Sequence, residues 1–221
     1  MQGNTYTAQT AHQTATTNKL IRNTYMLLSM TLIFSAIMAT VSVFLRLPGF
    51  TYLVSVIAGF VLASFVLPRY ANSSAGIGLV FLITGLLGLG LGPLLGMYLS
   101  LPNGSQTVGT ALGGTGIIFL TLSGYALTTR RDFSFMGGFL MTGFIVVLVA
   151  SLASIFLNMP ALNLAISGAV VMLMSGFLLF QTSQMVNGQE TNYILATVGL
   201  YITMFNIFVH LLQLIGFANN D

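Results

Sequence analysis

The chain has 221 residues, of which 56% are hydrophobic and only 4% are charged, and it carries a formal net charge of +3. It contains no cysteine, which excludes disulfides, thiol nucleophiles and thiolate metal sites. It also has no basic surface interleaved with aromatic side chains, so its charge gives no indication of a nucleic-acid partner.

Residues 1–18 form a polar segment, mostly Thr, Gln, Ala and Asn, without any acidic or basic side chain. Such a segment buries too little apolar surface to offset its ordering entropy, so we predict a disordered cytoplasmic tail. Two interpretations remain open: a passive leader before the first membrane span, or a flexible handle for a cytoplasmic partner. We interpret His12, alone in this solvated segment, as incidental.

Seven apolar stretches follow the tail, and none of them contains Lys, Arg, Asp or Glu. Each has about 18–25 residues, enough for an α-helix to cross roughly 30 Å of hydrocarbon. They cover residues 25–45, 50–67, 76–99, 108–128, 135–157, 162–185 and 193–217. The sequence therefore predicts an all-α integral membrane protein, with seven transmembrane helices in one domain of residues 19–221 that lies in the lipid bilayer.

The basic residues predict the orientation of these helices. Five of the six fall in gaps on one side of the membrane, whereas Arg46 falls on the other side. The five are Lys19, Arg22, Arg69, Arg130 and Arg131. Short loops rich in Lys and Arg stay in the cytoplasm. We therefore predict a cytoplasmic N-terminus and, after seven crossings, a periplasmic C-terminus.

Glycines recur at four-residue spacing in two of the spans: Gly88, Gly92 and Gly96 in 76–99, then Gly109 and Gly113 in 108–128. This spacing places the glycines of each span on one helix face, where a neighbouring helix can approach closely, and we predict packing within the chain over dimerisation. Pro93 lies inside the first run and should kink that helix. It frees a backbone carbonyl that a neighbour or water must satisfy.

A stripe of polar side chains follows the last span, residues 193–217. Thr203, Asn206, His210 and Gln213 are spaced by three, four and three residues, so they share one helix face. Unpaired polar groups are costly in hydrocarbon, so this face must turn toward other helices or water. We predict that the last helix is central. The stripe either forms interhelical hydrogen bonds, worth about 0.6 kcal/mol each, or lines a narrow path for ions or protons.

The sequence offers no enzyme. Ser123 and His210 are candidates for a serine–histidine dyad, but their depths in the predicted helices differ by about 17 Å, which excludes hydrogen-bond reach. The chain contains no HExxH motif, no phosphate-binding loop and no paired carboxylates. We therefore predict no catalytic residue, no bound metal and no cofactor.

Several segments resemble the Bax inhibitor family. The segment 127–138, Leu-Thr-Thr-Arg-Arg-Asp-Phe-Ser-Phe-Met-Gly-Gly, is similar to the family's signature loop and includes Arg130, Arg131 and Asp132. Residues 160–166 (Pro-Ala-Leu-Asn-Leu-Ala-Ile), residues 190–193 (Glu-Thr-Asn-Tyr) and most of 200–217 also match. Similarity runs from about residue 18 to the C-terminus. The resemblance implies seven helices, with the last surrounded by the other six.

The resemblance implies two different activities. Some members of the family are pH-sensitive calcium leaks that are gated by two aspartates on the last two helices. Another branch, found in the bacterial inner membrane, associates with the membrane-bound AAA protease FtsH and modulates it.

This sequence departs from the calcium-leak pattern. Matching residues 177–181 and 200–203 to the family places Gln181 and Thr203 at the aspartate positions. Neither side chain ionises, so an aspartate pair that shares a proton cannot form. The predicted helix boundaries place the two residues roughly 9 Å apart in depth. A neutral hydrogen bond between them could still join the last two helices.

The leading hypothesis is a non-enzymatic inner-membrane protein that binds FtsH and its associated proteins and modulates the protease. The tail of residues 1–18 and the lipid-facing helix surfaces are the predicted contact regions. The alternative is a calcium or proton leak along the last helix, which the missing aspartates disfavour. A mainly structural membrane subunit is the third interpretation.

Overall fold

The seven predicted spans appear as helices in the structure, a computed structural model that describes residues 2–157 and 159–219, without the side chains of residues 2–14. The helices are α1 (Gln2–Phe44), α2 (Phe50–Val61), the π-helix η1 (Leu62–Val66), α3 (Leu67–Tyr70), α4 (Ser74–Leu99), α5 (Gly104–Thr129), α6 (Met136–Leu157), α7 (Pro160–Val186) and α8 (Tyr193–Ala218). Seven helical segments within the described residues are long and apolar enough to cross a membrane. The predicted all-α membrane fold is confirmed.

The second span is continuous from Phe50 to Tyr70, but its helix widens at residues 62–66. There the Leu67 amide donates to the carbonyl of Leu62, five residues back. Pro68 follows directly, and in a regular α-helix its ring would clash with the carbonyl four residues earlier. The π-turn therefore accommodates Pro68 without ending the span.

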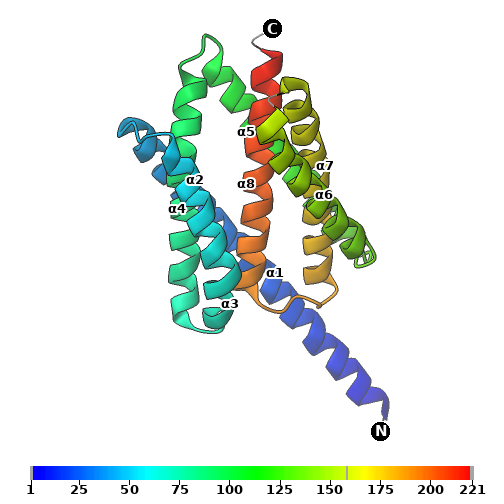
Figure 1. Cartoon of the computed structure of the whole chain (residues 1–221). Helices are drawn as coiled ribbons and strands as arrows, with labels where there is room; N and C mark the ends of the chain where they lie inside the picture. Colours follow the sequence, from blue (N-terminus) through cyan, green and yellow to red (C-terminus); the bar gives the residue numbers. More distant parts are fainter. Residues whose placement is uncertain (1, 158, 220–221) are drawn as a thin grey trace.

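The last helix, α8, lies in the middle of the bundle (Figure 1). Its main neighbours are α1, α4, α5 and α7, while α2 packs mainly on α4 and α6 mainly on α7. Four helices therefore form most of its surroundings, whereas the sequence predicted six. Between the pair α2 and α4 on one side and the pair α6 and α7 on the other, one face of α8 is open to view in Figure 1.

The glycine face of α4 packs closely on α1. A Cβ atom at Gly88 would lie 2.5 Å from the Ser35 carbonyl oxygen, and one at Gly92 would lie 1.9 Å from Ser42 Oγ. Only glycine permits this approach, and the predicted packing within the chain is confirmed for these two positions. The prediction of close packing is wrong for Gly96 of α4, where an added Cβ would have no neighbour within 4 Å.

The glycines of α5 do not form the predicted packing face either. A Cβ at Gly109 or Gly113 would likewise have no neighbour within 4 Å. Spacing alone shows only that residues share a helix face. Where the neighbouring helix lies depends on the tertiary arrangement.

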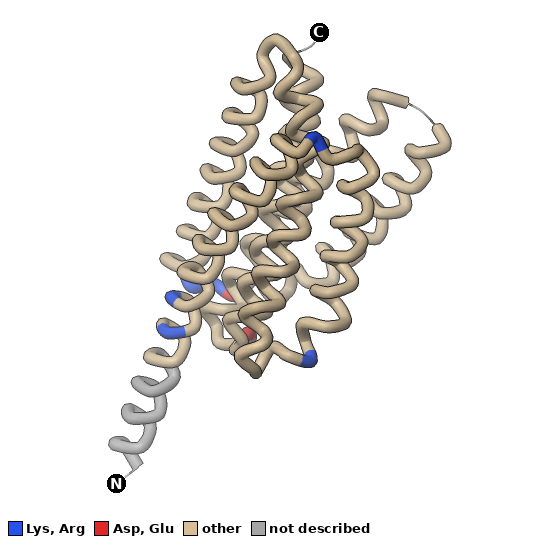
Figure 2. Tube along the Cα trace, turned by 90° about the vertical axis from the view of Figure 1, so that its left-hand side faces the viewer, with Lys and Arg blue, Asp and Glu red and all other residues tan. Residues whose placement is uncertain are grey.

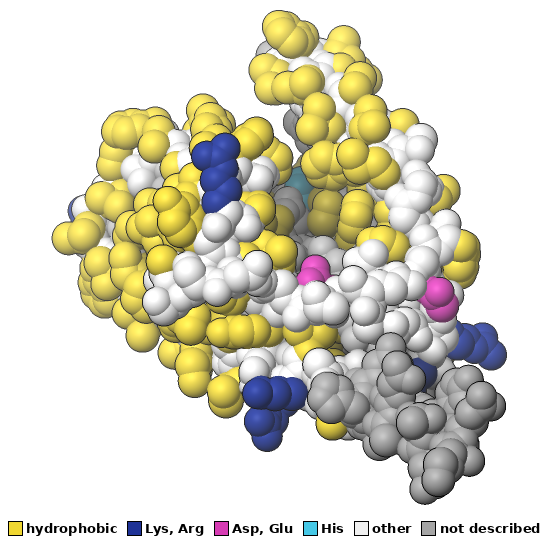
Figure 3. All heavy atoms as spheres, turned by 90° about the horizontal axis from the view of Figure 1, so that it is seen from below, with side chains coloured by type: hydrophobic (Ala, Val, Ile, Leu, Met, Phe, Trp, Pro, Cys, Tyr) yellow, Lys and Arg dark blue, Asp and Glu magenta, His cyan; other side chains and the backbone are white. Residues whose placement is uncertain are grey.

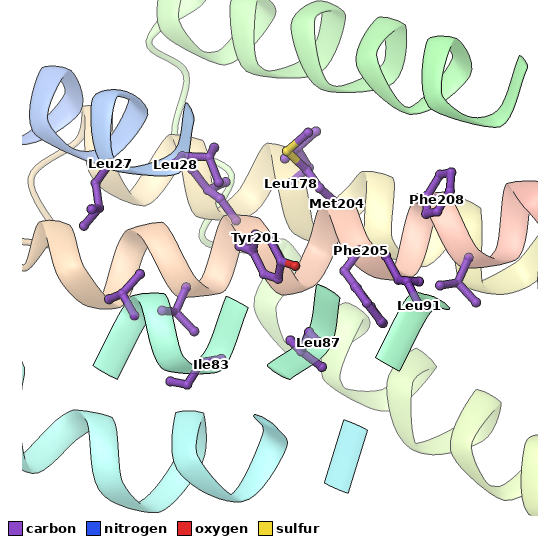
Figure 4. Close-up of a cluster of buried hydrophobic side chains, with 14 of the residues drawn as sticks. Leu27, Leu28, Ile83, Leu87, Leu91, Leu178, Tyr201, Met204, Phe205 and Phe208 are labelled. Carbon is purple, nitrogen blue, oxygen red and sulfur yellow. The ribbon is translucent and has the colours of Figure 1, made fainter. Parts of the chain in front are cut away.

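The main apolar core surrounds α8. Leu200, Ile207 and Leu212 are completely buried, and Tyr201 is 2% exposed. In Figure 4 Met204 and Phe208 extend from one side of α8, while Phe205 extends from another side toward Leu91 of α4. The polar stripe occupies the part of α8 that this apolar packing leaves free.

Most of the charged residues gather at one end of the bundle, near the N-terminal part of α1, while one basic position lies toward the other end, as Figure 2 shows. We call this the basic end and the opposite one the Arg46 end, after the basic residue that follows α1. This segregation accords with the predicted orientation, which stays a prediction.

The tail of residues 1–18 was predicted to be disordered. The backbone of residues 2–18 forms the first part of α1, and the side chains of residues 2–14, with His12 among them, lie outside the described part of the chain. Disorder of this segment in the cytoplasm therefore stays a prediction.

Candidate functional site

The helix that carries the polar stripe begins at Tyr193, and Asn192 caps it. Its side-chain oxygen accepts hydrogen bonds from the amides of Ile194 and Leu195, at 2.9 and 3.2 Å. Its side-chain nitrogen donates to the Ala71 carbonyl at 3.1 Å and to the Asn72 side-chain oxygen at 2.8 Å. One side chain thus satisfies two amides that every helix leaves free and ties α8 to the α3–α4 turn.

Gln181 and Thr203 meet between α7 and α8. The buried Thr203 hydroxyl donates to Gln181 Oε1 at 3.2 Å. The predicted separation of roughly 9 Å in depth therefore does not prevent contact between the two side chains. That separation was counted along the helix axes, and it leaves out the length of the glutamine side chain. The two residues form a neutral interhelical hydrogen bond.

A small pocket of about 220 Å³ opens beside this hydrogen bond, between α7 and α8. Gln181, Gln184 and Glu190 contribute its polar wall, and Ala196 and Gly199 contribute the wall on α8. Figure 3, which views the molecule from the basic end, shows this end hollowed near its centre. Because Ala196 and Gly199 precede Thr203 on the same helix face, the pocket leads toward the polar stripe.

Deeper in the bundle, His210 and Gln213 share one partner on α7. The Ser167 hydroxyl lies 2.8 Å from Gln213 Oε1 and 2.9 Å from the Asn163 carbonyl, and His210 Nδ1 lies 3.2 Å from Ser167 Oγ. A hydroxyl has one proton, and these two carbonyl-type acceptors attract it. We therefore infer that His210 Nδ1 carries a hydrogen and donates it to Ser167 Oγ.

Asn206 lies between these two groups and turns back onto its own helix. Its side-chain nitrogen donates to the Ile202 carbonyl at 2.8 Å. The stripe is therefore bonded to α7 at Thr203 and at His210 with Gln213. Asn206 lies between those points, and Asn206, His210 and Gln213 are each only half-buried.

Nothing in the sequence indicated that Ser167 would be the partner of His210 and Gln213. A serine on an apolar helix usually bonds to a carbonyl of its own preceding turn, as Ser175 does to Val171 on α7. The position of Ser167 opposite the polar stripe depends on how α7 and α8 pack, which the sequence of one helix does not show.

Ser123 and His210 are not partners in this bundle. Ser123 hydrogen-bonds to the Tyr25 hydroxyl and, at 3.3 Å, to the Thr182 hydroxyl. These bonds join α1, α5 and α7 near the basic end, whereas His210 pairs with Ser167. The structure therefore assembles no serine–histidine dyad from these two residues.

The predicted signature loop connects α5 and α6 and is fastened to the end of α7. The Ser183 hydroxyl donates to the Arg131 carbonyl at 3.0 Å, and the Phe133 amide donates to Ser183 Oγ at 2.9 Å. Arg130 takes a left-handed conformation with φ of 49°, which ends α5 and turns the chain toward α7.

Asp132 organises the exposed side of this loop. Its carboxylate accepts hydrogen bonds from the Ser134 amide at 2.8 Å and the Ser134 hydroxyl at 2.5 Å. These two bonds hold the pKa of the Asp132 carboxyl below its usual range, because both favour the ionised form. Gln189, in the α7–α8 loop, donates to the same carboxylate at 3.5 Å. The two loops at the basic end thus form one hydrogen-bonded surface.

Seven apolar helices with a neutral polar stripe between α7 and α8 define a multi-pass membrane protein whose polar groups are arranged for contact between helices. Residues 17–220 match the family model described as inhibitor of apoptosis-promoting Bax1. The chain belongs to the Bax inhibitor family, as the resemblance predicted.

Curated relatives cover nearly all of the chain. It is 50% identical over 205 residues to a protein of Escherichia coli K12 named "Modulator of FtsH protease YccA", with 93% of each chain covered. It is 45% identical over 209 residues to an uncharacterized membrane protein of Vibrio cholerae, covering 95% of this chain and 94% of that one. A Pseudomonas aeruginosa protein is 44% identical over 202 residues, covering 91% of this chain and 90% of that one.

Proposed function

We propose that this chain is a non-enzymatic inner-membrane protein that binds the FtsH protease and modulates its turnover of membrane proteins. The observation that carries the proposal is 50% identity, over 93% of both chains, to a relative named as a modulator of that protease. Ser123 and His210 bond to different partners, Tyr25 and Ser167, so these two residues do not form a serine–histidine dyad.

The proposed orientation places the basic end in the cytoplasm, where a AAA protease has its ATPase domains. Residues 1–18 would be presented there, next to the fastened α5–α6 and α7–α8 loops. Within the bilayer the outer surface of α6 is the candidate contact for membrane helices, because its large apolar side chains are exposed and it packs mainly on α7.

Co-purification in mild detergent from native membranes tests the partner. The full-length chain is compared with a version that lacks residues 1–18 and with one in which a Gly/Ser segment of equal length replaces them. We expect the membrane protease and its associated proteins to be enriched with the full-length chain and to be reduced in both tail variants. Recovery of the chain without the protease from all three preparations would contradict the proposal.

Modulation is tested separately with purified protease in proteoliposomes. The degradation rate of a membrane-protein substrate is measured with the full-length chain, with the tail-deleted chain and without either. We expect the full-length chain to change that rate. An unchanged rate at saturating chain would refute modulation, even if the two proteins co-purify.

A second candidate, an ion or proton conduit along α8, is favoured by the polar-walled pocket beside Gln181 and Thr203. If it is correct, Asn206→Leu and His210→Leu should each abolish calcium or proton flux in liposomes while the protein stays folded. Ser175→Ala is the matched control, because Ser175 bonds only to its own helix in the contacts described above. Equal flux in all variants would exclude the stripe as the path.

A further inference from the structure

A second cavity in this chain lies away from the polar stripe. It has a volume of about 510 Å³ and is lined by residues of α1, α4, α5 and α8. Ligand pockets in proteins have volumes of roughly 300–1,000 Å³, so the cavity is large enough for a substantial guest.

The cavity arises because α1 and α5 diverge. The two helices meet near the basic end, where the Tyr25 hydroxyl bonds to Ser123 and the Tyr25 ring lies 5.8 Å from that of Phe119. Toward the Arg46 end the cavity wall contains Val43 of α1 and Val108 of α5, with the cavity between them. The space therefore occupies the half of the bundle remote from the basic end. Thr40 of α1 and Leu112 of α5 line it and are exposed, so it opens to the outer surface of the bundle between these two helices.

The polar groups in the cavity wall are already satisfied by the protein. The Ser35 hydroxyl bonds to Tyr201 at 2.5 Å, and the Tyr201 hydroxyl lies 3.2 Å from the Thr84 carbonyl. The Thr40 and Thr115 hydroxyls each donate at 2.8 Å to a carbonyl of their own helix. The remaining wall is built from apolar side chains such as Leu95, Met204 and Phe208. The wall therefore suits a hydrocarbon ligand. A polar ligand would lose its hydrogen bonds to water on entering the cavity and find no free partner there.

A basic residue follows the end of a helix that lines this space. Val43 of α1 lines the cavity, α1 ends at Phe44, and Arg46 comes three residues after Val43 in the sequence. Arg46 is exposed and has φ of 49°, a left-handed conformation just past the end of α1. It directly follows the predicted span 25–45, so the predicted topology places it at the membrane surface. Its guanidinium suits a phosphate group, and among the described basic residues it alone is predicted on this side of the membrane.

We propose that the cavity binds one acyl chain of a membrane phospholipid, with the lipid phosphate held by Arg46. The cavity is apolar, lies within the depth of the spans and opens toward the surrounding hydrocarbon, and the cation marks the headgroup side. In the predicted orientation this lipid belongs to the periplasmic leaflet. The site is independent of the proposed protease interaction and of the polar stripe.

The test uses Gly116, which lines the cavity and where an added Cβ would meet nothing within 4 Å. The Cβ of Gly116→Leu therefore fits without a clash, and the rest of the leucine side chain takes up space in the cavity. Gly113→Leu is the matched control, since Gly113 lies on the same helix, has equally free space and does not line the cavity. Thermal unfolding of both variants verifies the fold.

Delipidated full-length protein in detergent is titrated with phosphatidylglycerol, and bound lipid is counted by native mass spectrometry. We expect one tightly bound phospholipid per chain in wild type and in Gly113→Leu. Occupancy in Gly116→Leu should fall roughly tenfold, because loss of even two methylene contacts weakens binding by that factor. Equal binding by the three proteins, or none by wild type, would overturn the proposal. Loss of a co-purifying protein with lipid binding unchanged would instead make a partner helix the occupant.

The headgroup contact is tested by Arg46→Asn, since asparagine tolerates the left-handed backbone at this position. We expect weaker binding of phosphatidylglycerol and a smaller change for zwitterionic phosphatidylethanolamine, titrated in parallel. Unchanged binding of both lipids would remove Arg46 from the site, and Gly116→Leu would still report on the acyl chain.

Discussion

The Ser42 hydroxyl of α1 donates a 2.7 Å hydrogen bond to the carbonyl oxygen of Leu89 on α4. Leu89 precedes Pro93 by four residues, so its carbonyl is the one that Pro93 leaves without an amide donor. The predicted need for a partner is thus met by a neighbouring helix. Gly92, beside Pro93, lets Ser42 come close enough to do so.

Ser42→Ala should destabilise the bundle, because it leaves the Leu89 carbonyl buried without a donor. We expect a loss of about 1–3 kcal/mol in the free energy of unfolding. Unfolding in SDS titrations of mixed micelles measures it. Ser29→Ala is the control, since the Ser29 hydroxyl bonds to Tyr25 of its own helix.

A double-mutant cycle isolates this hydrogen bond. Pro93→Ala restores an amide that can bond to Leu89, so Ser42→Ala should cost much less in that background. The same cost in both backgrounds would show that Ser42 does not act through the proline-freed carbonyl.

Gly92→Ala and Gly96→Ala should have opposite effects on stability. A Cβ at Gly92 would collide with Ser42 Oγ at 1.9 Å, and one at Gly96 would meet no neighbour within 4 Å. We expect Gly92→Ala to cost about 1–3 kcal/mol through overpacking. Gly96→Ala should gain roughly 0.5–1 kcal/mol through helix propensity. Thermal unfolding in one detergent compares them, and equal shifts would refute the close packing of α1 on α4.

Ser167→Ala should weaken the contact between α7 and α8, because His210 and Gln213 both lose their partner. We expect a cost of about 1–2 kcal/mol, above the average of about 0.6 kcal/mol for one interhelical hydrogen bond. Ser175→Ala, whose hydroxyl bonds to Val171 of α7, should change stability little. Equal stability of the two variants would show that the His210–Ser167–Gln213 cluster contributes nothing.

The α5–α6 loop should loosen in acid. The Ser134 hydroxyl and then its amide hold the pKa of Asp132 below its usual value of 3.8. A carboxyl with a depressed folded pKa contributes stability above its unfolded pKa and loses it as the pH falls through the folded value. Hydrogen exchange of residues 130–135 should therefore rise only below about pH 3.8. Asp132→Asn should show no such rise, which assigns the effect to this carboxyl.

Much of the fold was predictable because the solvent is hydrocarbon. A chain in a bilayer must satisfy its backbone hydrogen bonds within each segment, so an uninterrupted apolar stretch is already a helix. The predicted spans 50–67 and 193–217 begin at the residues where α2 and α8 begin. The first helix was placed least well, because polar residues before 25 continue α1 instead of ending it.

The residues of the candidate site on α8 were predictable from the sequence, whereas their hydrogen-bond partners on α7 were not. The spacing of Thr203, Asn206, His210 and Gln213 placed them on one face of α8, since helical periodicity is local. Their partners Gln181 and Ser167 lie on α7, 22 and 43 residues away from Thr203 and His210 respectively. Sequence separation carries no information on which turn of α7 faces which turn of α8.

The sequence by itself determined the number of spans, the polar face of the last helix and the need of the Leu89 carbonyl for a donor. Each of these depends on interactions within one helix or between a segment and its solvent. Only the tertiary structure decided that Gly92 packs while Gly109 does not, that Ser42 supplies the donor and that α1 and α5 part to leave a cavity. Those outcomes depend on which helices pack against one another. The helices have similar apolar surfaces, so in a membrane their arrangement is determined by close packing and by individual hydrogen bonds.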